Sequence, residues 1–361
     1  MPFVSRSNIA MRNAGHHAAL LARHMAEHDL AVRETGAETI LDVFGGEAAL
    51  RADDAQLRIV ATAHTLQALE DQKYFLASHL GELVTDQDID IAWDGDGAAR
   101  AWLPNFRAMR VVGVKELTPH MRRITLSGND LARFETTDNL HVKLYIPRGR
   151  TAPEWPSLAR NGRIEWPRGD ASLTGRKYTI RRVDVAAGLV DIDFVVHGDS
   201  GPGTAFARRA APGDEVGMMG PGGLGLRAAD WYLLAGDETA LPAIARILEN
   251  LPPSAEAVVR IEVSDRHERQ KLESAAGMDI VWLERDGAAP GVRLVEAVRS
   301  VRWPSDTRDT FAWAGCEHGA FKAIRSYLRK ERGLARDRHL VVAYWRRDEP
   351  AHRSASMADG A

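Results

Sequence analysis

The sequence has very little cysteine, no long hydrophobic run and no excess of charge of either sign. Cys316 is the only cysteine among 361 residues. This excludes an internal disulfide, and also an iron–sulfur cluster held by this chain alone, which needs about four thiolates. No window of about 18 uncharged apolar residues is present, and residues 1–12 lack a hydrophobic signal core. The formal net charge of −3 gives no general attraction to nucleic acid or to an anionic membrane. We therefore expect a soluble, cytoplasmic protein, a monomer or weak dimer, whose anion binding is local.

The chain is long enough for two or three domains, because a single core rarely grows past roughly 250 residues. Apolar residues recur at helical spacing over residues 14–29 and 63–84. Short strands bounded by turn residues are predicted between these helices, at residues 30–34, 38–44, 48–52 and 56–63. Residues 1–84 therefore read as a small α-β-β-β-α domain. Residues 85–105 carry five aspartates and no helical periodicity, which is typical of an acidic linker.

The first helix contains a motif associated with zinc, because His24, Glu27 and His28 match the pattern H-x-x-E-H. A working zinc site needs a third ligand and an open position, and the sequence downstream offers only carboxylates of solvent-exposed type. We interpret these residues as ordinary surface or half-buried histidines of a helix and predict no metal site in the chain. A zinc site at this motif is the alternative.

Closely spaced strand patterns with glycine and proline between them begin at Phe106. The strands are predicted at residues 109–114, 121–127, 140–146, 177–183, 189–197 and 215–219. Six short strands of this kind favour a small antiparallel barrel over residues 106–227. The insertion at residues 147–175 contains two tryptophans and four prolines and is predicted as an ordered loop.

Strands and helices alternate over residues 228–348, which indicates an open, doubly wound parallel sheet. The strands are predicted at residues 231–235, 257–263, 279–283, 310–314 and 340–345, and the helices at 241–250, 266–275, 292–301 and 318–332. Residues 349–361 read as a disordered tail.

Two glycine-containing turns are candidates for a phosphate-binding site. Residues 220–225 match G-x-G-x-x-G, but that fingerprint requires a strand before it and a helix after it, and we predict another strand after it, so we reject this motif. At residues 233–242 a strand ends, Gly236 turns the chain, Thr239 can cap, and Pro242 lies in the first helical turn. This arrangement leaves backbone N–H groups for a pyrophosphate. A plain loop with a good cap is the alternative, and spacing alone does not separate the two.

The ordered motifs of residues 106–348 resemble the siderophore-interacting proteins, a branch of the ferredoxin-reductase-like flavoproteins. The matching segments are residues 176–181 (RKYTIR), 193–198 (DFVVHG), 201–202 (GP), 212–214 (PGD), 220–223 (GPGG), 236–242 (GDETALP) and 344–346 (YWR). The resemblance implies an antiparallel β-barrel FAD domain followed by a parallel α/β NAD(P)-binding domain. Residues 14–84 resemble a separate small α/β family of unknown function that is sometimes fused to this one.

The resemblance assigns residues to FAD. Arg176 would bind its phosphates, Tyr178 would lie flat against the flavin or ribityl chain, and Thr179 would donate a hydrogen bond near the reactive ring. A second phosphate cradle would comprise His197, Gly198, Gly201 and Thr204. Tyr178 and Thr179 lie on opposite faces of a regular strand, so both can serve one flavin only at the strand end or through the backbone of Thr179.

The resemblance also assigns residues to NAD(P)H. The pyrophosphate would bind at Gly236, Asp237, Thr239 and Ala240. Arg266 stands where the adenine ribose is expected and favours NADPH, as does Arg269, although both can be solvated helix charges. Gly315 and Glu317 would line the nicotinamide crevice, and Trp345 would shield the flavin or nicotinamide. Cys316 is expected to be a packing residue.

The implied activity is NAD(P)H-dependent reduction of a ferric siderophore, with FAD as mediator and without protein ligands to the iron. Four basic residues, Lys177, Arg181, Arg346 and Arg347, could attract an anionic chelate. A general NAD(P)H:acceptor flavin reductase is one alternative. A non-catalytic protein that binds or senses iron chelates, with residues 14–84 as the partner-binding module, is another.

Overall fold

The computed structural model describes residues 2–27, 30–97, 103–149, 152–159, 161, 163–196, 201–223, 225–305 and 307–347. Two compact units are present. The first lies within Met1–Phe106 and Glu154–Ser172, and the second within Arg107–Pro153 and Leu173–Ala361. No helix of the described residues is long and apolar enough to cross a membrane.

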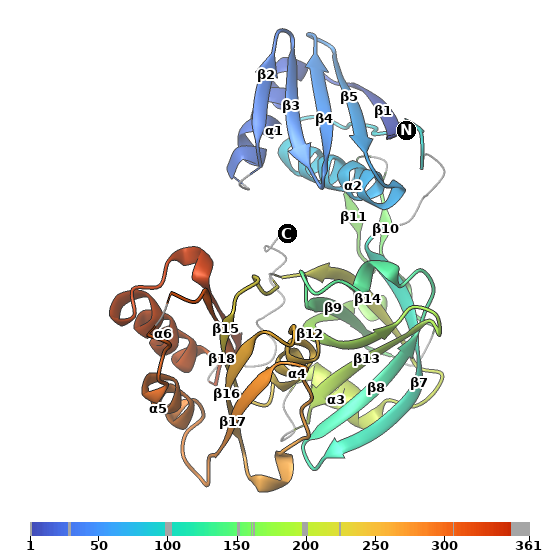
Figure 1. Ribbon diagram of the computed structural model, residues 1–361. Coiled ribbons are helices and arrows are strands. Elements are labelled where there is room, and N and C mark those ends of the chain that lie inside the picture. The colour runs from blue at the N-terminus through green and yellow to red at the C-terminus, as the bar shows by residue number, and fades with distance from the viewer. Residues whose placement is uncertain are drawn as a thin grey trace. The chain divides into compact units, whose positions relative to one another are not determined.

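The first unit is a six-stranded sheet with two helices on one face (Figure 1). The strand order is β2-β3-β4-β5-β1-β6. Alternate residues of the strands, such as Ile9, Leu41 and Ile59, pack against Leu21 and Leu76 of the helices. The elements are β1 (Phe3–Ala10), α1 (Ala14–Glu27), β2 (Val32–Thr35), β3 (Glu38–Val43), β4 (Gly46–Ala52), β5 (Gln56–Ala63), α2 (Leu66–Leu83) and β6 (Trp93–Gly95).

Three features of this unit correct the sequence-based predictions. The first strand, β1, was missed, and it pairs with both β5 and β6. The predicted acidic linker contains β6, so the linker interpretation was wrong at Trp93–Gly95. The predicted loop of residues 147–175 contains a two-stranded hairpin, β10 (Ser157–Leu158) with β11 (Ile164–Glu165). We call residues Glu154–Ser172 the arm. It packs within the first unit, where Arg163 Nε donates to the carbonyl of Gly81 at 2.6 Å.

The second unit begins with the predicted barrel, which is closed in the order β12-β13-β8-β7-β14-β9. All six predicted strands are present, and Ile124, Leu144, Ile180 and Ile192 fill the interior. The strands are β7 (Phe106–Thr118), β8 (Met121–Ser127), β9 (His141–Pro147), β12 (Leu173–Asp184), β13 (Leu189–Val195) and β14 (Glu215–Gly222), with the short 3-10 helices η1 (Ala132–Phe134) and η2 (Gly169–Ala171) between them.

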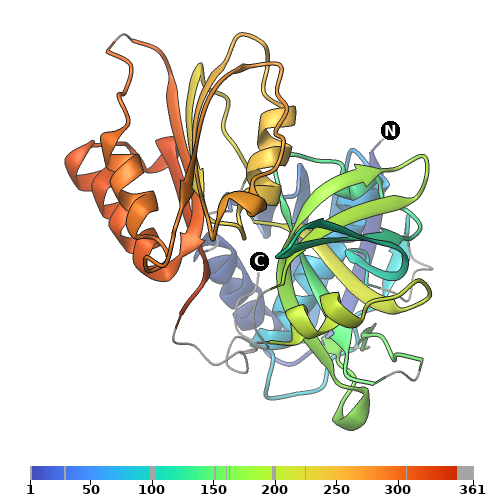
Figure 2. The ribbon, with the colours of Figure 1, turned by 90° about the horizontal axis from the view of Figure 1, so that it is seen from below.

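A five-stranded parallel sheet follows, in the order β17-β16-β15-β18-β19. Helix α4 packs on one face and helices α5 and α6 on the other (Figure 2), as doubly wound folds require. The elements are β15 (Trp231–Gly236), α4 (Leu241–Glu249), β16 (Glu256–Val263), η3 (Arg266–Glu268), β17 (Gly277–Glu284), α5 (Val292–Ser300), β18 (Thr310–Glu317), α6 (His318–Ser326), the π-helical turn η4 (Tyr327–Glu331), η5 (Arg336–Arg338) and β19 (His339–Trp345).

Two further predictions in this unit were wrong. No helix is predicted after Gly201, but residues Pro202–Arg209 form helix α3, which begins with a proline in its first turn. The predicted helix at residues 266–275 is only the 3-10 helix η3. Asp265 accepts a hydrogen bond from the backbone of His267, and Glu268 turns into a buried contact with the barrel, so tertiary contacts override the helix propensity of this segment.

Buried polar contacts join the barrel to the sheet. The guanidinium of Arg246 on α4 donates to the carbonyls of Ile180, Phe134 and Thr136 at 3.0, 3.1 and 2.6 Å. At the other end of the sheet, Glu268 accepts from the hydroxyl of Thr118 at 2.5 Å and from the backbone N–H of His120 at 3.0 Å. These bonds fix the edge of the sheet against the barrel strands.

Candidate functional site

The strand order reverses at β15. The chain runs from β15 outward to β16 and β17, then returns to β18 on the other side of β15. Ligands of open α/β sheets bind at such a switch point, outside the carboxyl ends of the strands. Gly236 ends β15 and Glu317 ends β18, so the predicted residues of both turns lie at this crevice.

The β15–α4 turn is packed too closely for any side chain at Gly236. A Cβ there would lie 2.5 Å from the Cβ of Ala240 and 2.8 Å from the carbonyl oxygen of Gly315. Ala240 is the residue before the first turn of α4, and no side chain caps this helix. The predicted cap by Thr239 was therefore wrong, and the N-terminal N–H groups of α4 face the crevice as an anion site requires.

Asp237 is the most heavily bonded residue of the crevice. Its Oδ1 accepts from the backbone N–H and the hydroxyl of Thr239 at 3.0 and 2.5 Å. Its Oδ2 accepts from the backbone N–H of Glu317 at 3.0 Å and from the indole Nε1 of Trp345 at 2.8 Å. Burial raises the pKa of Asp237 to about 6, although the hydrogen bonds from Thr239 and Trp345 act in the opposite direction. The side chain of Glu317 caps α6 through Gly319.

The barrel brings a second group of predicted residues together. Burial lowers the pKa of Arg176, and the same cause raises the pKa of the neighbouring Tyr178. The ring of Tyr178 packs on Phe194, with ring centroids 4.2 Å apart, and its hydroxyl lies where a Cβ on Gly203 would be. Gly201 precedes α3 with a φ of 99°, which favours glycine. Thr204 lies in the first turn of α3, so a guanidinium and a helix N-terminus lie around Tyr178.

Thr179 points to the other side of β12 and is 4 % exposed. Its hydroxyl shares a hydrogen bond with Tyr344, whose hydroxyl also lies 2.6 Å from Nε2 of His141. Burial lowers the pKa of His141 to about 4, with smaller effects of Lys177 and Arg246 in the same direction. The imidazole is therefore neutral near neutral pH. In this structure the Thr179 side chain contacts β19, and its proposed bond to a flavin stays a prediction.

The end of β16 is the edge expected for an adenine ribose. Arg266 is exposed there, whereas Arg269 forms an ion pair with Glu284 at 2.7 Å. The side chains of His120, Asp265 and Glu268 gather at the same edge with ligand atoms within 4.8 Å of one another. Both oxygens of Glu268 accept hydrogen bonds from the barrel, and its Oε1 lies 3.0 Å from Nδ1 of His120, so this cluster is accounted for by protein contacts.

Some predicted residues lie outside the described part of the chain. These are His197 and Gly198 of the second cradle, His28 of the zinc motif and the whole predicted tail, residues 349–361. The ring of His24 lies beside that of His79, with centroids 5.2 Å apart. Among the predicted chelate-attracting residues, Arg181 is engaged by Glu249 at 2.5 and 2.8 Å, and Lys177 is exposed.

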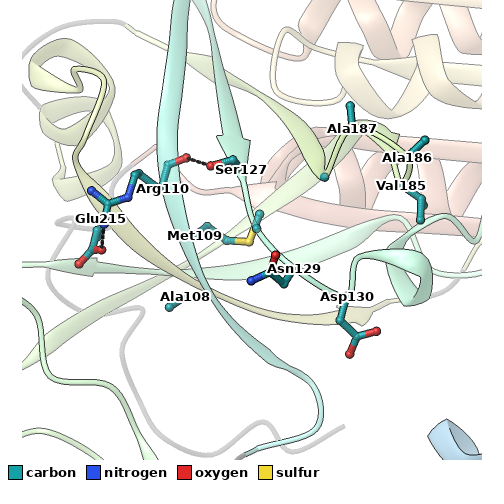
Figure 3. Close-up of a pocket in the computed structure, with 12 residues that line it drawn as sticks. Ala108, Met109, Arg110, Ser127, Asn129, Asp130, Val185, Ala186, Ala187 and Glu215 are labelled. Atoms are coloured by element: carbon teal, nitrogen blue, oxygen red, sulfur yellow. Dashed lines mark hydrogen bonds and ion pairs between the residues drawn. The ribbon is translucent and has the colours of Figure 1, made fainter.

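A hollow of about 600 Å³ lies elsewhere on the barrel (Figure 3). Arg110, which pairs with Glu215 at 2.8 Å, lines it together with Ser127, Asp130 and the β12–β13 turn around Ala186. None of the predicted site residues lines this hollow, so the chemistry of the molecule concentrates at the switch point and around α3.

Sequence reasoning missed His141 and Tyr344, which lie 203 residues apart in the chain. It also missed Arg246 and the hydrogen-bonding role of the Asp237 side chain. No local pattern marks these residues, because their partners come from distant strands. Tyr344 was visible only as a neighbour of Trp345 in a family motif.

Comparison with known proteins identifies each part of the chain. A model of the siderophore-interacting proteins matches residues 229–348, and one of the siderophore-interacting FAD-binding domain matches residues 110–225. Residues 6–94 match a family of uncharacterized proteins conserved in bacteria.

Individual relatives match the second unit over most of their own length. Ferric vibriobactin reductase of Vibrio cholerae is 32 % identical over 244 residues, which are 67 % of this chain and 89 % of the relative. The NADPH-dependent ferric-chelate reductase of Escherichia coli is 29 % identical and is covered to 92 %, against 66 % of this chain. The crystal structure of a siderophore utilization protein from T. fusca is 40 % identical with a TM-score of 0.58, covering 68 % of this chain and 94 % of that structure. The chain belongs to the siderophore-interacting protein family.

Proposed function

We propose that this protein reduces ferric siderophores with NAD(P)H as electron donor and FAD as mediator, and so releases ferrous iron. The observation that supports the proposal is one compact unit with a closed barrel that carries Arg176 and Tyr178 and a parallel sheet whose switch point carries Asp237. We assign the flavin to the first place and the pyridine nucleotide to the second. A protein that only binds iron chelates has no need of the second site. Cytoplasmic action is part of this proposal.

The barrel residues fit the phosphates of FAD. A guanidinium fork matches phosphate oxygens, and burial lowers the pKa of Arg176, so an anion bound beside it would stabilise its charged form. Gly203 is required for the approach of the Tyr178 hydroxyl, and the first turn of α3 offers N–H groups. FAD, when bound, accepts two electrons from NAD(P)H and passes them on singly. The chain's own residues bind and orient the two nucleotides.

The siderophore, rather than the protein, holds the ferric ion in this proposal. In the described residues only His120, Asp265 and Glu268 form a group of three possible metal ligands. Glu268 accepts hydrogen bonds from the barrel, and Asp265 accepts one from the backbone of His267. Each NAD(P)H supplies two electrons, which reduce two Fe(III) to Fe(II). Reduction weakens the grip of hard oxygen donors on iron, because they favour the more highly charged ion, and the metal is released.

NADPH is the proposed donor, because Arg266 is exposed at the ribose edge and the Asp265 carboxylate is turned to the backbone of His267. An arginine at this edge accommodates a 2′-phosphate. The expected result for Arg266→Ala is a higher KM for NADPH and an unchanged KM for NADH. Arg269→Ala is the matched control, since Arg269 pairs with Glu284. Equal effects of the two variants would remove the assignment to Arg266.

The decisive experiment begins with the visible spectrum of the purified protein. NADPH or NADH is then added anaerobically, followed by a ferric hydroxamate or catecholate with a ferrous trap. The proposal expects bound flavin that bleaches with one nucleotide and reoxidises as trapped ferrous iron appears. Protein that takes up no FAD contradicts it. Flavin that bleaches but ignores ferric chelates identifies a general flavin reductase instead.

The proposal that Arg176 binds the FAD phosphates is tested with Arg176→Lys. This variant keeps the positive charge and removes the guanidinium group that can bind two phosphate oxygens at once. We expect weaker FAD binding, by about tenfold for the loss of one charge-assisted hydrogen bond. Arg182→Lys, on the same strand with a side chain 66 % exposed, is the matched control. FAD affinity equal in both variants would exclude Arg176 from the phosphate site.

A further inference from the structure

Three separate segments meet at one buried carboxylate on the switch point. Asp237 is 2 % exposed and accepts from Thr239 in the β15–α4 turn, from the Glu317 N–H after β18, and from Trp345 at the end of β19. We propose that Asp237 is a positioning residue that holds the indole of Trp345 in place as one wall of the crevice that receives the nicotinamide ring.

The chemistry of the four donors explains why an aspartate is present. A carboxylate has about four lone-pair directions and no N–H of its own. Asp237 uses two acceptor bonds at each oxygen, so its capacity is filled. An asparagine of the same shape would place an N–H against one of these donors, which leaves a buried polar group unsatisfied. The bonds thus require a group that only accepts.

The position of Trp345 makes it the part of this arrangement that touches a ligand. Its partner across the strands is Glu317, the last residue of β18, so the indole lies at the carboxyl edge of the sheet, next to the switch point. The residue as a whole is half-buried. Aromatic rings pack against one another in offset or edge-on geometry, and a flat, fixed indole offers the nicotinamide ring such a surface.

The hydrogen bond from Trp345 to Asp237 fixes the orientation of the indole ring, which packing alone would not determine. Trp345 lies on β19, at the edge of the sheet, where it has a neighbouring strand on one side only. The bond at 2.8 Å to a residue 108 positions earlier in the chain ties this edge to the centre of the sheet. The same carboxylate also binds the backbone N–H of Glu317 in the β18–α6 turn. Asp237 therefore holds both Trp345 and this turn in place.

The identity of the ligand rests on the proposed function, whereas the hold on Trp345 does not, and the two are tested separately. The first test uses protein free of nucleotides, labelled with ¹⁵N-tryptophan, with the indole resonance of Trp345 assigned by its loss in Trp345→Phe. The expected result is exchange of this N–H with water about tenfold slower than that of an exposed indole, for a bond of ordinary strength to a charged group. If the Trp345 indole N–H of the unaltered protein exchanges with water as fast as an exposed indole, the proposal is overturned.

Two variants then separate positioning from general packing. Asp237→Ala removes the acceptor, and we expect the Trp345 resonance to shift and its exchange to become about tenfold faster. Thr239→Val removes a different donor to the same carboxylate, and the Trp345 resonance is expected to stay in place. Equal changes in both variants, or no change in Asp237→Ala, contradict the assignment.

Kinetics of the FAD-loaded protein test the consequence for the ligand. In Asp237→Ala the KM for NAD(P)H is expected to rise about tenfold, while flavin content and the rate at which chemically reduced protein reduces a ferric chelate stay unchanged. An unchanged KM for NAD(P)H contradicts the proposal that Trp345, held by Asp237, contacts the nicotinamide ring. Protein that holds Trp345 as described but reduces no chelate refutes the proposed function and leaves the positioning role intact.

Discussion

Two carboxylates lie buried at the ends of adjacent strands, and they are stabilised differently. Glu262 on β16 is 0 % exposed and accepts from the backbone N–H groups of Gly291 and Leu294 at the start of α5, at 2.8 and 3.1 Å. Its Oε1 also lies 3.5 Å from the guanidinium of Arg285. Asp237, at 2 % exposure, receives its four hydrogen bonds from neutral groups. A buried charge is stabilised by a cation or a helix N-terminus. Glu262 has both beside it, whereas Asp237 accepts one bond from the N-cap residue of α6 and its other bonds from neutral groups of Thr239 and Trp345.

The difference separates a structural site from a functional one. Glu262 anchors α5 and has a cation beside it. Asp237 has a pKa raised to about 6 by burial and bonds to residues that face the crevice. Perturbed carboxyl groups concentrate at functional sites, and the four predictions below test whether this contrast between Asp237 and Glu262 is real.

The largest effect is expected from removing the shared cation with Arg285→Met. Arg285 pairs with Glu238, through Nη1 at 2.8 Å, and lies beside Glu262. Loss of one partner of a buried pair typically costs about 3–5 kcal/mol, because the remaining charge is uncompensated. We expect a decrease of that size in the free energy of unfolding, measured with urea near neutral pH and smaller in acid. Arg182→Met, at an exposed arginine, is the control, and equal losses would contradict the prediction.

A smaller loss is expected for Glu262→Gln. The amide keeps the shape but turns an N–H toward the first turn of α5, so a charge-assisted hydrogen bond worth about 2 kcal/mol is lost. Urea denaturation measures the decrease. Glu296→Gln changes an exposed glutamate of the same helix, where surface substitutions stay within about 0.5 kcal/mol. A loss no larger than this control would show that Glu262 does not anchor α5.

Asp237→Asn is expected to combine the loss from one unsatisfied amide N–H with a dependence on pH. The pKa of Asp237 is raised from 3.8 to about 6 in the folded protein, so between these values the folded state binds the proton more tightly than the unfolded state. Stability of the unaltered protein relative to the variant therefore falls as pH rises from 3.8 to 6 and is constant above. Urea denaturation across this pH range measures the difference in the free energy of unfolding between the two proteins. A difference that rises with pH would contradict the raised pKa of Asp237.

The smallest effect is expected at a more exposed carboxylate of the same unit. Glu249 is 39 % exposed and pairs with Arg181. Glu249→Gln should lower the free energy of unfolding by less than about 1 kcal/mol, and less still in high salt, because water and ions screen such pairs. Urea denaturation at two salt concentrations measures this. A loss comparable with that of Glu262→Gln would remove the distinction between buried and exposed carboxylates.

Most of the second unit could be predicted from the sequence, because its signals are local. Alternation and turns marked all six barrel strands, and the repeat of strand and helix marked the parallel sheet. The misses have a common physical cause. Strands β1 and β6 pair across roughly the length of their domain, α3 is obscured by glycine and proline at its start, and η3 is shortened by the burial of Glu268.

The site was predicted at the level of backbone turns and not at the level of side chains. Glycine spacing pointed to Gly236, whose neighbours do exclude a side chain. The bonds of Asp237 to Glu317 and Trp345 span 80 and 108 residues, and the contact of His141 with Tyr344 spans more. Such pairs are created by the crossing of distant strands, so no spacing rule finds them.

The path of the arm has a consequence for how the protein can be divided. The chain leaves the first unit after Phe106, returns to it at Glu154 and leaves again after Ser172, directly before β12. The two units are thus joined by three peptide crossings rather than one. A chain that begins at Arg107 would carry an arm without its natural partners, including the carbonyl of Gly81 that Arg163 binds. The arm ends at Ser172, one peptide bond before β12, the strand that bears Arg176 and Tyr178.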